Sequence, residues 1–131
     1  MSELPGDLLF TKDHEWLRRE DDGSVTIGIT DFAQAALGDL VYVELPEIDH
    51  EVEEGGEMAV VESVKAASDV YAPIAGKVIA VNDNLADDPE MINSDAFGDG
   101  WIVRIQLSDG LDESALMSPG DYQQFIDELD D

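Results

Sequence analysis

Residues 58–81 read MAVVESVKAASDVYAPIAGKVIAV, and this stretch decides the expected fold. Short apolar runs at 58–64, 69–74 and 77–81 alternate with small or turn-forming residues, including the proline and glycine of the turn at 73–76. Apolar runs of this length, bounded by turn residues, are typical of β-strands. The stretch therefore predicts three strands in quick succession, with the residues that follow Val64 at the tip of the first hairpin.

The chain before this stretch also predicts β-structure, with one short helix. A polar turn at 20–24 leads into an alternating apolar pattern at 25–29, which indicates a hairpin with a half-buried second strand. The alanine-rich segment 31–37 follows Thr30, a good N-cap, and precedes Gly38, a residue type that commonly ends helices. We expect a helix over 31–37.

Two further segments lie between this helix and the stretch 58–81. Residues 40–45 are rich in β-branched and aromatic residues and stop at Pro46, which predicts a strand. Residues 47–57 are acidic and contain a glycine pair, which predicts an exposed loop. After Asn82 the chain is again polar and is expected to connect strands.

The C-terminal part adds one strand and one helix. Residues 101–107 alternate in the manner of a strand. A serine, a proline and an acidic residue at 118–121 form a helix start, and Tyr122, Phe125 and Ile126 then follow at helical spacing. We expect a helix near 119–129 that docks one apolar face on the β-structure. The chain thus predicts one mainly β domain spanning residues 1–131.

The composition excludes several classes of function. Six Lys and Arg residues stand against 32 Asp and Glu residues, a formal net charge of −26. Such a charge opposes binding to nucleic acid or to anionic membranes, because both attract proteins through clustered basic residues. The acidity is interpreted as solubility or adaptation to a salty cytoplasm, and steering toward basic patches on partners is the alternative.

Cysteine is absent, so the chain has no thiol chemistry or disulfide of its own. His14 and His50 lie far apart in sequence, and the acidic loop lacks the spacing of a calcium-binding loop, so no metal site is expected. No apolar run is long enough to span a bilayer, and the first seven residues resemble neither a secretory signal nor a transit peptide. We expect a cytoplasmic protein.

Lys65 is the most unusual of the three lysines. It falls between two predicted strands, is followed by Ala66-Ala67-Ser68, and has no acidic residue within 63–68. An exposed amine flanked by small residues suits a modifying enzyme that must bring an activated acyl group onto the nitrogen. On these features alone, an ordinary solvated turn lysine remains the alternative.

The residues around Lys65 closely resemble the lipoyl-attachment segment of the glycine cleavage system H-protein family. The segment ESVKAASDVYAPIAGKV at 62–78 carries this resemblance. Other matches follow in the family's order: HEW at 14–16, GITDFAQ at 28–34, LGD at 37–39, VELP at 43–46, VN at 81–82, IN at 92–93 and DGW at 99–101. Ala59, Met91 and Ala96 depart from the family's pattern, and these changes concern local backbone shape rather than Lys65.

The resemblance implies a flattened antiparallel β-barrel or sandwich, of the barrel-sandwich hybrid type seen in lipoyl domains, with Lys65 at a hairpin. It implies a carrier that is not an enzyme, with lipoate joined by an amide bond to Lys65. The implied partners are a pyridoxal-phosphate glycine decarboxylase (P protein), a tetrahydrofolate-dependent aminomethyltransferase (T protein) and dihydrolipoamide dehydrogenase (L protein). A lipoate ligase or a lipoyl or octanoyl transferase would modify the lysine. A monomer is expected.

The resemblance also implies a shelter for the aminomethyl-loaded arm, with Glu15 and Asp69 at the matching positions. Carboxylates suit this role because they pair with an amine in a cleft that limits water access. The alternatives are a solvated strand acid for Glu15 and a turn acid capping the hairpin for Asp69.

Three other functions remain open on the sequence. One is a biotinyl or lipoyl domain of a carboxylase or 2-oxo acid dehydrogenase, although biotin carriers usually have Met-Lys-Met and dehydrogenase domains Asp-Lys-Ala where this chain has Val64-Lys65-Ala66. Another is a lipoyl donor to other carriers. The last is an unmodified protein-interaction module.

Overall fold

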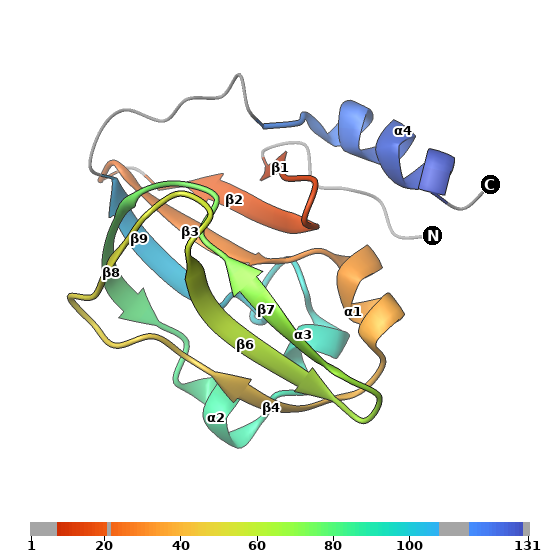
Figure 1. Cartoon of the computed structure of the whole chain (residues 1–131), viewed down its shortest axis with the longest axis horizontal. Coiled ribbons are helices and arrows are strands. Elements are labelled where there is room, and N and C mark those ends of the chain that lie inside the picture. The colour runs from red at the N-terminus through yellow and green to blue at the C-terminus, as the bar shows by residue number, and fades with distance from the viewer. Residues whose placement is uncertain (1–7, 21, 108–115, 130–131) are drawn as a thin grey trace.

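The computed structural model describes residues 8–20, 22–107 and 116–129, and these form two antiparallel sheets packed face to face (Figure 1). The large sheet has six strands in the order β1 (Leu9–Phe10), β2 (Glu15–Arg19), β3 (Ser24–Ile29), β9 (Val103–Leu107), β8 (Gly76–Val81) and β5 (Glu51–Val52). The small sheet has three strands in the order β4 (Leu40–Glu44), β6 (Glu57–Ser63) and β7 (Ala67–Tyr71). Neither strand order closes on itself. The expected mainly β fold is confirmed, in the form of an open sandwich rather than a closed barrel.

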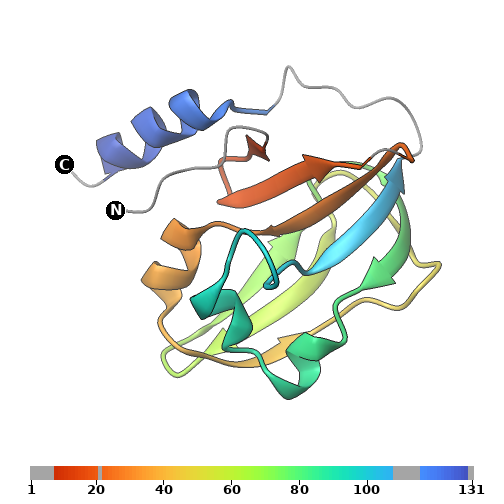
Figure 2. The same ribbon diagram turned by 180° about the vertical axis from the view of Figure 1, so that it is seen from behind.

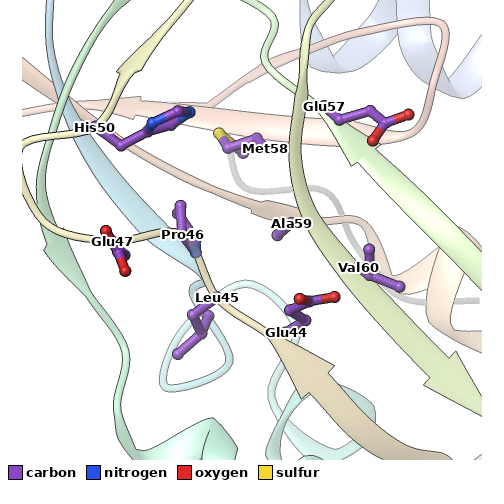
Figure 3. A pocket seen from close by; sticks show the side chains of 9 residues that line it. All are labelled: Glu44, Leu45, Pro46, Glu47, His50, Glu57, Met58, Ala59 and Val60. Atoms are coloured by element: carbon purple, nitrogen blue, oxygen red, sulfur yellow. The ribbon is translucent and has the colours of Figure 1, made fainter.

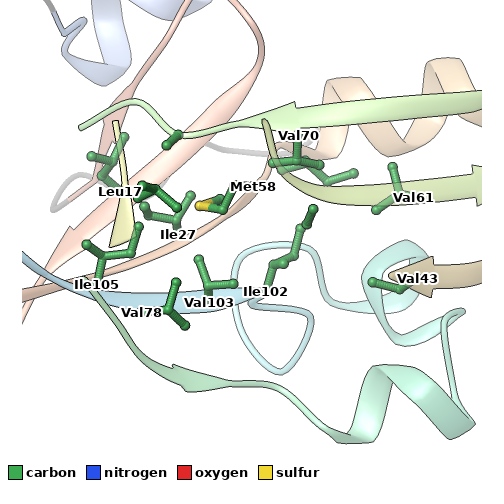
Figure 4. Close-up of a cluster of buried hydrophobic side chains, with 14 of the residues drawn as sticks. Leu17, Ile27, Val43, Met58, Val61, Val70, Val78, Ile102, Val103 and Ile105 are labelled. Atoms are coloured by element: carbon green, nitrogen blue, oxygen red, sulfur yellow. The ribbon is translucent and has the colours of Figure 1, made fainter. Parts of the chain in front are cut away.

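The apolar core lies between the two sheets (Figure 4). Met58, Val61 and Val70 point inward from the small sheet, and they face Leu17, Ile27, Val78, Val103 and Ile105 of the large sheet. Alternate residues of a strand point to one face, as Val103 and Ile105 do, and the register shift between Glu57 and Ala59 lets Met58 face inward although it lies three residues before Val61. Both sheets therefore contribute to one continuous core.

Helix α1 (Asp31–Leu37) has the boundaries that its flanking residues predict. The Thr30 hydroxyl accepts a hydrogen bond from Ala33 N at 3.2 Å. Gly38 ends the helix with φ 89°, a left-handed conformation in which glycine is favoured, and its N–H donates to Gln34 O at 2.9 Å.

Helix α4 (Pro119–Leu129) confirms the predicted C-terminal helix and its docking. Tyr122 and Ile126 are buried in a second cluster with Leu8, Phe10 and Trp16, and Phe125 packs against this cluster. Figure 2 shows the helix on the outside of the molecule, along the β1 edge of the large sheet. The side chain of Leu129, the turn residue Asp21 and the first seven residues lie outside the described part of the chain.

Five expectations need correction. Strand β3 is buried on both faces rather than half-buried, because all six of its residues are buried. The acidic segment 47–57 is not wholly an exposed loop, because it contains strand β5, in which Val52 is buried opposite Gly76 of β8. The polar stretch after Asn82 contains two short helices, α2 (Asn84–Asp87) and α3 (Met91–Ser94), anchored by the buried Leu85 and Ile92. A two-residue strand and four-residue helices are too short to produce a periodic pattern.

The two remaining corrections concern strand boundaries. Strand β7 begins at Ala67, earlier than expected, because the small residues after the tip already pair with β6. Strand β9 begins at Val103 rather than Trp101, and the preceding Ile102 is itself fully buried. None of the helices in the described residues is long and apolar enough to cross a membrane.

Candidate functional site

Lys65 lies at the tip of the β6–β7 hairpin, in the turn formed by Val64, Lys65 and Ala66. The buried Ser63 shapes this turn: its hydroxyl oxygen accepts hydrogen bonds from Lys65 N and Ala66 N, both at 3.1 Å. The same hydroxyl donates to Ala66 O at 3.1 Å, and Ser63 N donates to Ala66 O at 2.8 Å. Ser63 therefore satisfies the N–H groups of Lys65 and Ala66 and the carbonyl group of Ala66.

The Lys65 side chain is exposed and rests beside the end of helix α1. A Cβ atom added at Gly38 would lie 3.1 Å from Lys65 Cε and 3.8 Å from Nζ. Within residues 8–20, 22–107 and 116–129, no ion pair involves this ammonium group. The amine is accessible at a hairpin tip, as its sequence surroundings predict.

Glu15 of β2 is almost fully buried, with 2% of its surface exposed, so the alternative of a solvated strand acid is wrong. Its Oε2 accepts a hydrogen bond from Tyr71 N at 2.9 Å, and its Oε1 accepts one from the Thr11 hydroxyl at 3.3 Å. Burial, with a smaller contribution from Asp13, raises the pKa of Glu15 from 4.5 to about 8. The carboxyl group thus joins the large sheet to the free edge of β7.

Asp69 is exposed and lies within β7 opposite Val60, so it is a strand residue and does not belong to the hairpin turn. Its carboxylate is the main cause that raises the pKa of Tyr71 above the usual tyrosine value. Glu15 and Asp69 therefore both border Tyr71, one through the backbone N–H and the other through the side chain. Lys65 lies at the other end of β7, which spans about 13 Å.

Sequence reasoning missed Thr11 and Tyr71, the two hydrogen-bond donors to the Glu15 carboxyl group. Thr11 also accepts a hydrogen bond from Glu15 N at 3.2 Å through its hydroxyl oxygen, in a turn where His14 has φ 67°. A threonine four residues before a carboxylate is a weak signal, and nothing in the sequence indicates the Tyr71 contact.

The two histidines are not brought together. His14 Nδ1 lies 2.8 Å from Tyr122 Oη, beneath helix α4, whereas His50 is exposed near β5. No group of three or more metal-ligating side chains occurs within the described part of the chain.

A hollow of about 460 Å³ lies at the end of the small sheet away from Lys65. It is lined by Glu44, Leu45, Pro46, Glu47, His50, Glu57, Met58, Ala59 and Val60 (Figure 3). The strand register fixes its position, because Leu40 pairs with Ser63 next to the lysine turn, whereas Glu44 pairs with Val60 at the opposite end. The hollow is therefore lined by none of the predicted site residues Glu15, Lys65 and Asp69.

Comparison with known proteins gives one consistent result. A family model described as "Glycine cleavage H-protein" matches residues 8–129. A glycine cleavage system H protein from Shewanella denitrificans is 59% identical over 128 residues, covering 98% of this chain and 99% of that protein. One from Pseudoalteromonas translucida is 54% identical with the same coverage. The crystal structure of a glycine cleavage system H protein from Mycobacterium marinum matches with a TM-score of 0.87 and 38% identity, covering 95% of this chain and 99% of that one.

Proposed function

Because the chain belongs to the glycine cleavage H-protein family, the carrier component of the glycine cleavage system, we propose that Lys65 is the residue that carries its lipoyl group. The observation that carries this proposal is the exposed amine at a hairpin tip whose backbone is hydrogen-bonded to Ser63. Lys12 and Lys77 are exposed as well, but Lys77 lies within strand β8, and Lys12 is followed directly by the carboxylate of Asp13, whereas residues 63–68 contain no acidic residue.

The surroundings of Lys65 fit an amide-linked group. Ala66 and Ala67 are exposed and small, so an acylating enzyme can approach the nitrogen without displacing bulky side chains. Gly38 leaves room for the lysine stem. When bound, the lipoyl group would supply a disulfide that can be reduced and reoxidised and that can carry a one-carbon amine, chemistry that a chain without cysteine lacks.

We propose that the chain has no catalytic activity of its own and presents Lys65 to other proteins. These are glycine decarboxylase, the aminomethyltransferase, dihydrolipoamide dehydrogenase and the lipoate ligase or transferase. A net charge of −26 would steer the carrier toward basic surfaces around their active sites. Tethering also raises the effective concentration of the carried group at each docked enzyme. We further propose that the chain forms a single domain, because its two sheets share one core.

We propose that Glu15 and Asp69 receive the cationic amine at the Tyr71 end of β7. Glu15 is almost fully buried in a site that disfavours its ionised form, so an ammonium group held near the exposed Asp69 would act on Glu15 through its charge and favour ionisation. Asp69 is exposed beside it and would extend the negative surface toward the solvent. Lys65 Nζ itself lies beside Gly38. Only a group attached to this nitrogen would therefore reach the two carboxyl groups.

The attachment site can be tested by mass spectrometry. Protein from lipoate-competent cells should show one lipoyl addition, which peptide fragmentation places on Lys65. Lys65→Arg should abolish the addition, whereas the matched variant Lys77→Arg, at another exposed lysine, should retain it. An addition at Lys12 or Lys77, a biotinyl group, or no addition at all would contradict the proposal.

The carrier role needs a separate measurement. Lys65→Arg should retain the wild-type unfolding transition and lose glycine-dependent carbon dioxide exchange with purified glycine decarboxylase. Exchange at the wild-type rate would show that Lys65 is not needed to carry the group.

A further inference from the structure

Asn93 of helix α3 makes three hydrogen bonds with its carboxamide group, one to Gln34 within helix α1 and two to Gly38 and Leu40 just beyond its end. Its Nδ2 donates to Gln34 Oε1 at 2.8 Å and to Gly38 O at 3.0 Å. Its Oδ1 accepts from Leu40 N at 2.9 Å. We call residues 38–40 the support segment, and Asn93 holds it at both ends.

The support segment contacts the lysine hairpin directly. The carbonyl group of Asp39, the middle residue of the segment, accepts a hydrogen bond from Val64 N at 3.1 Å. Gly38, its first residue, faces the stem of Lys65. In both views the tip of the β6–β7 hairpin lies beside the connection from α1 to β4 (Figures 1 and 2). The position of this segment therefore determines where the Val64 N–H and the Lys65 stem are held.

Apart from Asn93, the support segment is held by the hydrogen bond from Gly38 N to Gln34 O and by the pairing of Leu40 with Ser63 of β6. Gly38 has φ 89°, and glycine has more backbone freedom to lose than any other residue type. Asp39 is exposed, and only the third residue, Leu40, reaches the core. Without the Asn93 amide, both Gly38 O and Leu40 N would lose their side-chain partner, and the segment would populate other conformations.

We infer that Asn93 is a positioning residue for Lys65: its amide fixes the support segment and thereby holds the lysine turn in the conformation that the modifying enzyme binds. This inference rests on the proposed function, since it concerns the same lysine. Asn93 does not touch the lysine itself. It acts through Gly38, Asp39 and Leu40.

The test uses the full chain in its unmodified form, a purified lipoate protein ligase and lipoyl-adenylate. For Asn93→Ala we expect KM for the protein substrate to rise about tenfold, because apparent affinity falls with the fraction of molecules in the binding-competent conformation. We expect kcat to change less than about twofold, since the bound lysine is unaltered. Asn84→Ala is the matched control, because Asn84 is an exposed asparagine of the neighbouring helix α2.

A second measurement follows the hairpin without any ligase. Hydrogen exchange of the Val64 amide, which donates to Asp39 O, should become about tenfold faster in Asn93→Ala. Exchange of the Ala33 amide, held by Thr30 at the other end of α1, should stay the same. A merely destabilised protein would lose protection at both amides.

Two milder variants keep the inference testable if Asn93→Ala folds poorly. Asn93→Asp keeps the acceptor for Leu40 N but removes the donor to Gly38 O, and we expect most of the rise in KM. Gln34→Ala removes one of the two acceptors, and we expect a rise of about two- to threefold.

The outcomes separate the inference from the proposed function. If wild-type protein is modified at Lys65 while Asn93→Ala and Asn93→Asp show wild-type KM and wild-type exchange at Val64, the inference is wrong and the function stands. If exchange at Val64 rises as expected but wild-type protein accepts no lipoyl group at Lys65, the proposed function fails and the role assigned to Asn93 in acceptor recognition fails with it.

Discussion

The two ends of helix α1 are held by opposite kinds of interaction. At its N-terminus, Thr30 is fully buried beside the aromatic cluster that docks α4. At its C-terminus, Gly38 lies next to an exposed lysine, and the backbone there is held by hydrogen bonds from Asn93. The seven-residue helix thus connects an apolar docking site to an accessible hairpin.

The N-terminal end depends on one tyrosine of α4. Tyr122 Oη lies 2.7 Å from Thr30 Oγ1 and 2.8 Å from His14 Nδ1. Its ring stacks on Phe10 with a centroid separation of 4.7 Å. Buried apolar area gives this end most of its stability, and the three polar groups satisfy one another.

A carrier built in this way can be stable and still present a reactive group. Apolar burial stabilises strongly but hides the residues that provide it. Hydrogen bonds to the backbone stabilise less, yet they fix a conformation while leaving side chains in solvent. We call the N-terminal end of α1, with Thr30 and the aromatic cluster beside it, the aromatic end. Substitutions there should lower stability, whereas substitutions near Lys65 should alter how well the chain accepts a lipoyl group.

The largest expected effect is that of Phe10→Ala at the aromatic end. Phe10 is fully buried and stacks on Tyr122, so its removal should lower the free energy of unfolding by about 3–5 kcal/mol. Urea denaturation measures this change. Folded Phe10→Ala protein should still accept a lipoyl group with nearly wild-type KM, and a large rise in KM would show that the two ends are not separable.

The next effect concerns Glu15, which pairs with Ile29 next to the N-terminal end of α1. Its pKa is raised to about 8, so the folded state holds a proton that the unfolded state releases near pH 4.5. Its contribution to stability is therefore fully present below pH 4.5 and is lost as the pH rises through about 8. The loss is of the order of 2–4 kcal/mol, below the full value of the shift because buried sites relax and admit water.

Glu15→Gln should remove this pH dependence, because glutamine is neutral throughout the range. Urea denaturation at several pH values between 5 and 8 measures it. Glu44→Gln, at an exposed carboxylate of β4, controls for the loss of one negative charge. If wild-type and Glu15→Gln proteins have parallel stability profiles, Glu15 is ionised in the folded state at neutral pH.

A smaller effect is expected for Tyr122→Phe. The ring remains, but Thr30 and His14 lose their hydrogen-bond partner in a buried site, which should lower the free energy of unfolding by about 1–3 kcal/mol. Tyr42→Phe is the control, because Tyr42 is exposed on β4. Equal stability of the two variants would mean that the Tyr122 hydroxyl contributes nothing to docking.

The sequence predicts the features that nearby residues specify. Thr30 and Gly38 mark the ends of α1 because a cap and a left-handed residue act within one helical turn. The strands around Lys65 are predictable because their alternation and turn residues are local. Resemblance to a known family then gives Lys65 a proposed chemical role that its immediate neighbours do not provide.

Contacts between distant segments could not be predicted in this way. Glu15 and Tyr71 are 56 positions apart, and their hydrogen bond exists only because the edge of β7 meets β2 across the two sheets. Asn93 likewise reaches Leu40 from 53 positions away. Leu85 and Ile92 anchor helices that are too short to show a period, so their burial follows from tertiary structure.

The smallest effect belongs to His14, whose neighbours include Asp13, Glu15 and Tyr122. Partial burial lowers the pKa of His14 below 6.5, and the attraction of Asp13 only partly opposes this. The unfolded state therefore takes up the proton more readily, so the His14 contribution to stability is present above pH 6.5 and is lost as the pH falls below it. The His14 contribution to stability thus rises with pH, whereas the Glu15 contribution falls.

The two opposed dependences can be separated in the Glu15→Gln background. There, the decline in stability between pH 6.5 and 5 should be steeper with His14 than with His14→Asn, a replacement that also tolerates the left-handed backbone at φ 67°. Titration of the His14 ring by NMR gives the pKa directly. A pKa above 6.5, or equal slopes in the two proteins, would show that solvent reaches this ring freely, and then the aromatic end of α1 would be less tightly closed than its buried residues indicate.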